Sequence, residues 1–463
     1  MSPKENVSPA MPGILLCFFL SGAAGLVYQV AWGKALGLIF GHTVYAIATV
    51  LAVFMGGLAV GSALLGRWSE RRARPVALYG WIELGVAAAG ALSLAGLAGV
   101  RALYLAAFPA VSGSVASLLG LRFVGAAIVL FLPTFLMGGT LPILVGGLTR
   151  TSADLGRRVS RLYWVNTLGA VAGTFAAGFV LLPALGLRRT VAVAVVLNVL
   201  AGVVALALSR RFAAPVPAAP EPRAVGASAT PSPLPAEPAA APESAAFLLA
   251  SFAVVGGAAI AYEIAWTRLL ATILGSSTYA FTLMLATFLG GIVLGSIFFE
   301  RWYARANRVS LATFSRTQTW TAVAALLFLV FFQQLPNVVP PILRATNESF
   351  GGLVLAQFAT SALAMLPAAV VFGFNFPAVV VLIAGSRREG AHYAAAVGRA
   401  YAANTFGAIV AAVIAGFWLV PRLGAFRVVA LLAGVNLLLA LALEFRSSGR
   451  RLTALAVNCA LLA

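Results

Sequence analysis

The sequence contains few charged residues and almost none of the side chains that bind metal ions. Only 9% of its 463 residues are charged and 62% are hydrophobic, with a mean hydropathy of +1.00. This composition excludes a soluble globular protein and predicts an all-α integral membrane protein. Asp154 is the single aspartate, and no His/Cys cluster has metal-ligand spacing. We therefore expect no catalytic site, no metal and no cofactor in this chain.

The two cysteines say nothing about redox compartment. Cys17 and Cys459 both lie in apolar segments, so they build no disulfide framework. The apolar run that begins after Gly13 continues past the length of a signal-peptide core without a clear cleavage site. We interpret it as a retained first helix.

The charge that is present is strongly basic, with a formal net charge of +19. In a soluble chain this excess would indicate nucleic acid as a partner. Here most Lys and Arg residues sit in short loops between apolar runs, so the lipid bilayer is the expected partner and nucleic acid is not. Their bias to alternate loops predicts a multi-pass protein of the bacterial inner membrane with both termini cytoplasmic.

One sequence frame occurs twice. Residues Ser21–Lys34 return as Val255–Arg268, with Tyr28 matching Tyr262, Gln29 matching Glu263 and Trp32 matching Trp266. The same register then aligns Gly61-Ser62 with Gly295-Ser296 and Arg67-Trp68 with Arg301-Trp302. A match this long indicates a tandem duplication, so function has to be interpreted across both copies.

Each copy contains six apolar runs near the 20 or so residues that a bilayer crossing needs. The predicted crossings are 13–33, 43–65, 76–98, 121–147, 160–182 and 189–208, then 246–267, 278–299, 311–333, 355–384, 394–420 and 426–444. Between the third and fourth crossings, residues 100–118 and 334–352 look too broken to span, and we expect an outer loop or an interfacial helix there. Since both copies begin on the inner side, the prediction is about 12 transmembrane helices in two parallel six-helix repeats.

The predicted domain boundaries follow from this pattern. Residues 1–208 form the first repeat and 246–445 the second, and the Ala/Pro-rich residues 209–245 form a flexible cytoplasmic linker that cannot bury a core. Residues 446–463 form a tail that is apolar again but too short to cross, and they could begin a further helix.

Prolines flank glycines in the fourth crossing of each repeat, as in Pro133–Pro142 and Pro367–Pro377. Proline in a spanning helix frees a backbone carbonyl and kinks the helix. We expect broken or bent fourth helices, which either expose backbone to a substrate or only improve packing.

Glu263 is the most informative ionisable residue, because a charge inside a spanning segment is costly and marks a functional site by default. With Tyr262 beside it and Trp266 a turn away, its carboxylate suits an organic cation through charge pairing and cation–π attraction. The alternative is a pair with Arg268 near the interface. Gln29, its counterpart, keeps the polarity without the charge.

Glu83 is the other acidic residue within a crossing, and its counterpart lies near Gln318. Glu83 and Glu263 could border one cavity between the repeats, or titrate as a proton-coupling site. For Lys34 and Arg268 we favour basic side chains that extend to the interface from a helix end.

The remaining candidate residues are polar or aromatic and occur in both copies. Asn166 and Asn404 are expected to hydrogen-bond between helices rather than contact substrate. The predicted lining of a substrate path consists of Tyr28, Trp32, Tyr262, Trp266, Tyr45 and Tyr279.

The plan of two six-crossing halves resembles the major facilitator superfamily. Residues Gly61–Arg72 resemble the loop signature of that superfamily, except that Gly66 stands at its acidic position, which puts the usual gating ion pair in doubt. More specifically, the motifs around Leu26–Trp32 and Tyr262–Leu269 resemble the membrane part of bacterial fused transporter/spermidine synthase proteins. This resemblance covers residues 13–445 and implies a membrane domain linked to polyamine chemistry. It implies no synthase activity here, because the chain shows no Gly-rich nucleotide loop followed by an acidic residue.

Three functional interpretations remain open. The first is a carrier-like protein that moves a small organic cation, such as a polyamine, by alternating access. The second is a non-transporting anchor or channelling module for a spermidine-synthase-like domain or partner. The third is a lipid- or anion-handling protein that uses Lys34 and Arg268.

Overall fold

The computed structural model describes residues 10–41, 44–149, 152–212, 245–275, 277–306, 309–345, 349–385 and 393–447. Within these residues every regular element is a helix, and eleven helical stretches are long and apolar enough to cross a membrane. The prediction of an all-α integral membrane protein is confirmed. Most of the predicted linker (213–244) and most of the tail (448–463) lie outside the described residues, so the domain boundaries stay predictions.

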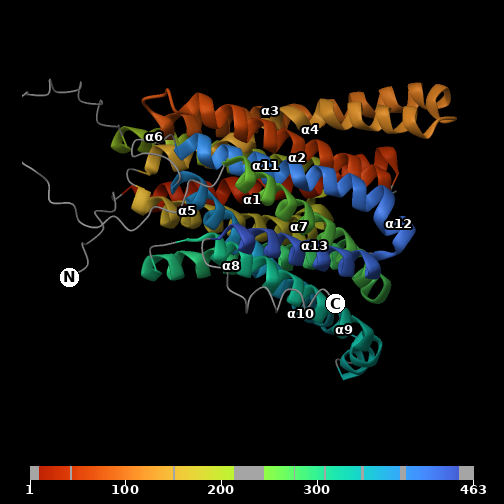
Figure 1. Ribbon diagram of the computed structural model, residues 1–463. Coiled ribbons are helices and arrows are strands. Elements are labelled where there is room, and N and C mark those ends of the chain that lie inside the picture. The colour runs from red at the N-terminus through yellow and green to blue at the C-terminus, as the bar shows by residue number, and fades with distance from the viewer. Residues whose placement is uncertain are drawn as a thin grey trace, which may run out of the picture.

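The helices form two parallel repeats of the same plan (Figure 1). The first contains α1 Met11–Phe40, α2 Val44–Ser69, α3 Pro75–Val111, α4 Val115–Leu148, α5 Ser152–Phe175, the π-helix η1 Ala176–Leu181, α6 Leu182–Ser209 and the short η2 Arg210–Phe212. The second contains α7 Ala245–Leu274, α8 Thr278–Ala306, α9 Leu311–Ala345, α10 Phe350–Gly385, α11 Tyr393–Ile414, the π-helix η3 Ala415–Leu419, α12 Val420–Leu423 and α13 Ala425–Arg446.

One stretch holds two crossings. Helical structure runs over 59 residues from Asp154 to Phe212, nearly three times the 20 or so residues that one crossing needs. Gly186 breaks this stretch, because its φ of 70° and ψ of 175° are not helical. Gly424, with φ 80° and ψ 151°, separates α12 from α13 in the same way. Each repeat therefore places a glycine with positive φ between its fifth and sixth crossings, where other residues would be strained.

Helices α1 and α7 run further than the sequence predicts, and each ends in a matched cap. Gly41 and Gly275 follow them with φ of 86° and 79°. Nη2 of Arg122 donates to the Phe40 carbonyl at 2.9 Å, and Nε2 of Gln357 donates to the Leu274 carbonyl at 2.9 Å. These side chains satisfy carbonyls that a helix end leaves without a partner. Lys34 and Arg268 therefore lie within helices and not at helix ends.

The fourth helices are continuous rather than broken, since α4 contains Pro133 and Pro142 and α10 contains Pro367 and Pro377 without interruption. The glycines between these prolines make close helix contacts. A Cβ atom at Gly138 would clash with the Leu58 carbonyl of α2, and one at Gly373 with the Ile292 carbonyl of α8. The packing interpretation of these motifs agrees with the structure.

The two stretches predicted as loops or interfacial helices are helical extensions, so that prediction is wrong. Helix α3 has 37 residues, about 55 Å at 1.5 Å per residue, against a hydrocarbon core of about 30 Å. The hairpins α3–α4 and α9–α10 project from the bundle at the same end (Figure 1). We name this the distal end. The proximal end is the one at which α1 and α5 begin and α2 ends.

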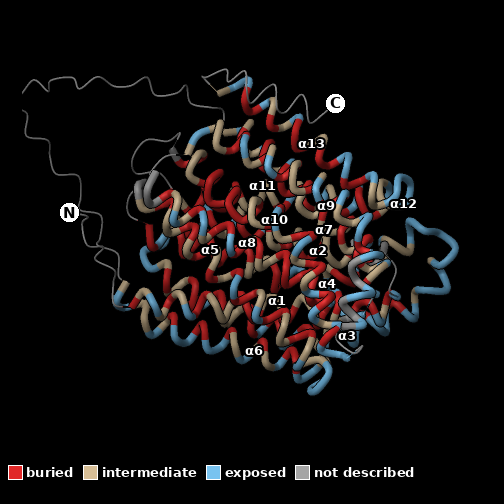
Figure 2. The backbone as a smooth tube through the Cα atoms, turned by 90° about the horizontal axis from the view of Figure 1, so that it is seen from below, coloured by how far each residue is buried: buried red, intermediate tan, exposed pale blue. Residues whose placement is uncertain are grey.

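The two repeats contact each other mainly along two helix pairs, α2 with α11 and α5 with α8, and less extensively through α4 with α11 and α5 with α10. Helices α3 and α6 pack within the first repeat, and α9 and α13 within the second. Among the described residues, α1 and α7 do not pack closely against each other. Figure 2 shows buried residues concentrated between the helices and exposed ones around the outside.

Candidate functional site

Glu83 is fully buried inside the first repeat. Its Oε2 accepts a hydrogen bond from Nδ2 of Asn198 on α6 at 2.6 Å. The side chains of Ser21 on α1 and Tyr79 on α3 are further polar neighbours. A buried carboxylate needs such donors, because desolvation without them is expensive. The structure thus places Glu83 between α1, α3 and α6, and it does not bring Glu83 together with Glu263.

The second repeat builds the same cluster with an amide. Nδ2 of Asn436 on α13 donates to Oε1 of Gln318 on α9 at 3.0 Å, and the Tyr262 hydroxyl donates to Oδ1 of Asn436 at 3.1 Å. Both Gln318 and Asn436 are fully buried. Glu83 and Gln318 therefore accept the same hydrogen bond from corresponding asparagines, once as a carboxylate and once as a neutral amide.

The repeated Tyr–Trp pairs stack within their own repeats. Tyr28 lies on Trp32 with ring centroids 4.7 Å apart, and Tyr262 lies on Trp266 at 4.9 Å. All four side chains are fully buried. They offer no ring face to a ligand in this conformation, so their contact with a substrate stays a prediction.

The environments of the two indoles differ. Nε1 of Trp32 donates to the Ser93 hydroxyl at 2.9 Å, whereas Trp266 meets the edge of Phe328. Both partners lie on the third helix of their repeat. The indoles therefore anchor α1 to α3 and α7 to α9, by a hydrogen bond in one copy and an aromatic contact in the other.

Glu263 is half-buried and lies well inside α7, about 16 Å before its end at Leu274. It makes no ion pair or hydrogen bond with any residue that the structure describes, and the exposed Arg268 does not neutralise it. Residues seven apart lie almost in line on a helix, so Glu263 shares a face with Gly256, which packs on Asn404 of α11. The carboxylate therefore lies toward a helix that contacts the other repeat.

Gln29 has the matching position on α1 and is also half-buried. It shares a face with Gly22, which packs on Asn166 of α5. Nδ2 of Asn166 donates to the Phe18 carbonyl at 3.0 Å, the interhelical bond that the sequence predicts. At Asn404 the described contact is backbone packing on α7.

Tyr279 lies at the boundary between the repeats. Its ring is 5.1 Å from that of Phe179 in η1 and 5.5 Å from that of Phe350 in α10. Tyr45 belongs to α2, but its side chain lies outside the described residues. Of the predicted path residues with a described side chain, Tyr279 is the one placed between the repeats.

An ion pair joins the repeats at the proximal end. The Arg161 guanidinium of α5 donates to Oε1 of Glu300 on α8, through Nε at 2.8 Å and Nη2 at 2.5 Å. Nε1 of Trp164 donates to Oε2 of Glu300 at 2.8 Å. Both carboxylate oxygens therefore bind α5, and charge-assisted bonds of this kind are stronger than neutral ones.

Glu300 was missed by the sequence analysis, although a signal existed. It aligns with Gly66, the position at which the loop signature lacks its acid. The acid is thus present in the second copy, and it forms the pair that Gly66 cannot form.

The α2–α11 contact has different chemistry at the matching place. The Ser62 hydroxyl donates to the Gly398 carbonyl at 3.3 Å, and a Cβ atom at Gly66 would lie 3.1 Å from the Ala394 carbonyl. The Ala395 N–H donates to Oε1 of Glu70 at 2.8 Å. The described contacts at this place therefore consist of close backbone approaches and hydrogen bonds to backbone groups.

Aromatic rings cross between the repeats on α5, α10 and α11. Phe376 lies 4.5 Å from Tyr163 and 6.0 Å from Tyr401, centroid to centroid. Tyr163 is two residues from Arg161 on α5, so an aromatic contact and an ion pair both join the repeats toward the proximal end. In the part of the chain that the structure describes, no group of three His, Cys, Asp or Glu residues could hold a metal ion.

Sequence comparison finds partial relatives. No protein-family model matches the chain. It is 29% identical over 192 residues to "Polyamine aminopropyltransferase 1" of Streptomyces coelicolor, and 32% identical over 197 residues to "Polyamine aminopropyltransferase" of Mycobacterium tuberculosis. These matches cover 41% of this chain but only 33% and 34% of the relatives, so the chain spans about a third of their length.

Structure comparison covers nearly the whole chain. A bacterial homologue of the iron transporter ferroportin, in an outward-facing state, matches 95% of this chain and 99% of its own, with a TM-score of 0.59 and 14% identity. The human organic anion transporter MFSD10 matches 94% of this chain and 100% of its own, with a TM-score of 0.51 and 13% identity. At these identities the likeness concerns the fold alone. The chain is therefore a multi-pass integral membrane protein with the fold of the major facilitator transporters.

Proposed function

We propose that this chain is a carrier that moves a small organic cation of the polyamine class by alternating access. The observation that carries the proposal is the Glu263 carboxylate, which is half-buried inside α7 without a described counter-ion. A charge in this position is costly, and a protonated amine would supply the missing partner. Glu263 lies toward α11, one of the helices at the boundary between the repeats, where a major facilitator fold binds its substrate near the midplane.

Two further observations support the proposal. The relatives that match part of the chain are named polyamine aminopropyltransferases, which connects this kind of membrane region to amines. The ion pair between Arg161 and Glu300 joins the repeats at the proximal end, as a closed end of an alternating-access carrier requires. In our proposal the proximal end is cytoplasmic in the bacterial inner membrane, and both termini lie on that side.

The proposed roles of the candidate residues differ. Glu263 pairs with an ammonium group, while Gln29 and Tyr279 are polar or aromatic neighbours of the path. Glu83 acts as a buried polar centre of the first repeat rather than as a second substrate ligand. Tyr28, Trp32, Tyr262 and Trp266 reach the path only when the repeats rearrange.

The test is uptake of labelled spermidine into proteoliposomes. We expect saturable uptake by the native chain and a loss of at least about tenfold in Glu263→Gln, because one charged hydrogen bond contributes roughly 1.5–3 kcal/mol. The chain offers a matched variant, Gln29→Glu combined with Glu263→Gln, which moves the carboxylate to the corresponding site of the other repeat. Partial recovery in this variant would place the cation between α1 and α7. Undiminished uptake in Glu263→Gln would contradict the proposal.

A second candidate function rests on the names of the partial relatives. The chain could be the membrane anchor or channelling module of a spermidine-synthase-like domain or partner, because the matched part is a third of each relative. Co-reconstitution with a soluble aminopropyltransferase tests this function. An anchor binds the enzyme whether residue 263 is Glu or Gln and shows no uptake by itself. A carrier takes up spermidine without the enzyme and loses this uptake in Glu263→Gln.

A further inference from the structure

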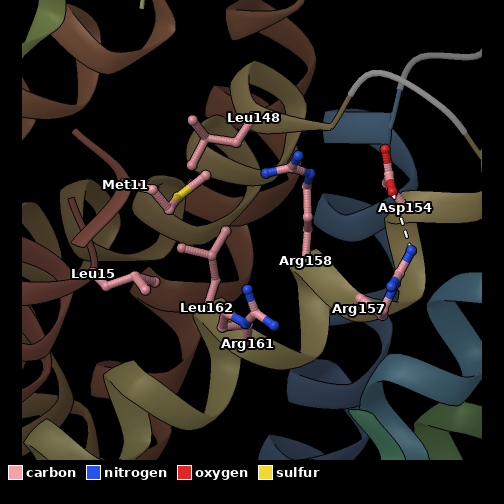
Figure 3. A pocket seen from close by; sticks show the side chains of 8 residues that line it. All are labelled: Met11, Leu15, Leu148, Asp154, Arg157, Arg158, Arg161 and Leu162. Atoms are coloured by element: carbon pink, nitrogen blue, oxygen red, sulfur yellow. Dashed lines mark ion pairs between the residues drawn. The ribbon is translucent and has the colours of Figure 1, made fainter. Parts of the chain in front are cut away.

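A pocket at the proximal end combines an apolar wall with an arginine rim. It lies where α1 begins, α4 ends and α5 begins, as Figure 3 shows. The apolar wall consists of Met11, Leu15, Leu148 and Leu162, and the charged residues are Asp154, Arg157, Arg158 and Arg161, all from α5.

The charges around this pocket do not balance. Arg157 pairs with Asp154 at 3.5 Å, and Arg161 pairs with Glu300. Arg158 makes no hydrogen bond or ion pair with another described residue, and its Nε is buried without a partner. Among the described residues, Arg158 is thus the one guanidinium group of this pocket without a carboxylate partner.

The duplication shows that the fold itself does not require this charge. Tyr163-Trp164-Val165-Asn166 aligns with Tyr401-Ala402-Ala403-Asn404, and in the same register Arg157 and Arg158 align with Ala395 and Ala396. Both alanines are buried at the corresponding place on α11. Since the second copy folds with small neutral residues here, packing does not explain the two arginines of the first copy.

We propose that this pocket binds a phosphate-bearing anion, with Arg158 as its main ligand. A guanidinium presents its N–H donors in a planar fork that matches phosphate oxygens. The four apolar side chains beside it fit the glycerol and upper acyl region of a phospholipid, and basic pockets between membrane helices at the cytoplasmic side are known to hold such headgroups. A free phosphate group that enters from water has the same chemistry, and the experiment distinguishes the two sources.

Arg161 allows a second test of the proposed site, because it lines the pocket and is also bound to Glu300. Removing the negative charge of Glu300 frees this guanidinium for the anion. The Glu300→Gln variant is therefore expected to bind the anion more tightly than the native chain, a direction that a merely structural arginine cluster would not give.

The experiment uses the full chain in phosphatidylcholine nanodiscs. Binding of phosphatidylglycerol is measured by native mass spectrometry, and binding of inorganic phosphate by calorimetry. The test variant is Arg158→Ala, which we expect to fold because Ala396 occupies the corresponding position in the second copy. The matched control is Arg71→Ala, at the same end of the protein but outside the pocket. For Glu300→Gln the charge-matched control is Glu70→Gln.

We expect Arg158→Ala to weaken binding by about tenfold or more, since charged hydrogen bonds contribute that much, and Arg71→Ala to stay within about twofold. Binding of phosphatidylglycerol but not of phosphate identifies a lipid headgroup as the ligand, and binding of both identifies an open phosphate site. Equal effects of Arg158→Ala and Arg71→Ala, or no binding of either probe to the native chain, would overturn the proposal.

Discussion

The two main contacts between the repeats differ in the chemistry of their described residues. On one side α5 and α8 are joined by Arg161, Trp164 and Glu300. On the other side α2 and α11 approach through Gly66 and Gly398, with little side-chain volume between their backbones. The duplication makes the comparison direct, because Glu300 aligns with Gly66 and Arg161 with Arg399.

This difference indicates which contact can open. Hydrogen bonds between charged side chains can be exchanged for bonds to water, so an ion pair at a helix end separates at modest cost. The van der Waals contacts of two closely packed backbones are not replaced by bonds to water in this way, so separating the helices loses their packing energy. We therefore expect the α2–α11 contact to persist and the proximal α5–α8 contact to open during a transport cycle.

The largest expected effect comes from filling the glycine contact. A Cβ atom at Gly398 would lie 2.5 Å from the Ser62 carbonyl, so Gly398→Val forces α2 and α11 apart. Overpacking of this kind costs about 1–3 kcal/mol, and we expect the upper part of that range here. Thermal unfolding of the purified protein measures the effect.

The matched variant for Gly398 is Ser160→Ala on α5. Ser160 already carries a side chain, whose hydroxyl donates to the Ser296 carbonyl at 2.5 Å. Losing that bond costs about 1 kcal/mol. Equal destabilisation by the two variants would show that the two contacts do not differ as we infer.

Glu300→Gln has the next largest effect. It leaves Arg161 without its charged acceptor, and hydrogen bonds to charged groups contribute roughly 1.5–3 kcal/mol. We expect the proximal ends of α5 and α8 to separate in a larger fraction of molecules, measured as a longer distance between spin labels at these ends.

A double-mutant cycle gives the control for the ion pair. If Arg161 and Glu300 act through each other, adding Arg161→Gln to Glu300→Gln changes the distance distribution little further. An unchanged distribution in Glu300→Gln alone would show that the ion pair does not hold the proximal end closed.

The sequence was sufficient to predict the architecture but not the contacts between the repeats. The recurring Tyr-x-x-x-Trp frame and the apolar runs predict two parallel six-helix repeats, and the fold confirms them. The ends of α1 and α7 were placed too early, because their caps come from Arg122 and Gln357, residues distant in sequence. A local pattern carries no information about such a partner.

The hydrogen-bond and ion-pair partners of these residues could not be predicted from the sequence either. Predicting the pair between Arg161 and Glu300 requires knowing that α5 faces α8, which depends on how two complete repeats dock. Likewise, Glu83 is recognisable as a buried carboxylate from the sequence, but its donor, Asn198, lies on another helix. Tyr262 and Trp266, the aromatic residues expected beside Glu263, are stacked on each other and fully buried, so their contact with a substrate stays a prediction.

Glu83→Gln is the smallest predicted change. The second repeat holds Gln318 in the same cluster, with Nδ2 of Asn436 donating to its Oε1 at 3.0 Å, so a glutamine at residue 83 can accept the bond from Asn198. We expect the free energy of unfolding to change by less than about 1 kcal/mol, since a neutral hydrogen bond replaces a charged one while the cost of burying a charge is removed. Asn198→Ala is the contrasting variant, because it leaves the buried carboxylate without its amide donor and should cost about 1–3 kcal/mol. If Glu83→Gln keeps stability but abolishes transport, the carboxylate carries a proton or a substrate charge that Gln318 does not. If transport persists, Glu83 serves packing of the first repeat alone. Glu263 is then the acidic residue within the crossings that we expect to take part in transport.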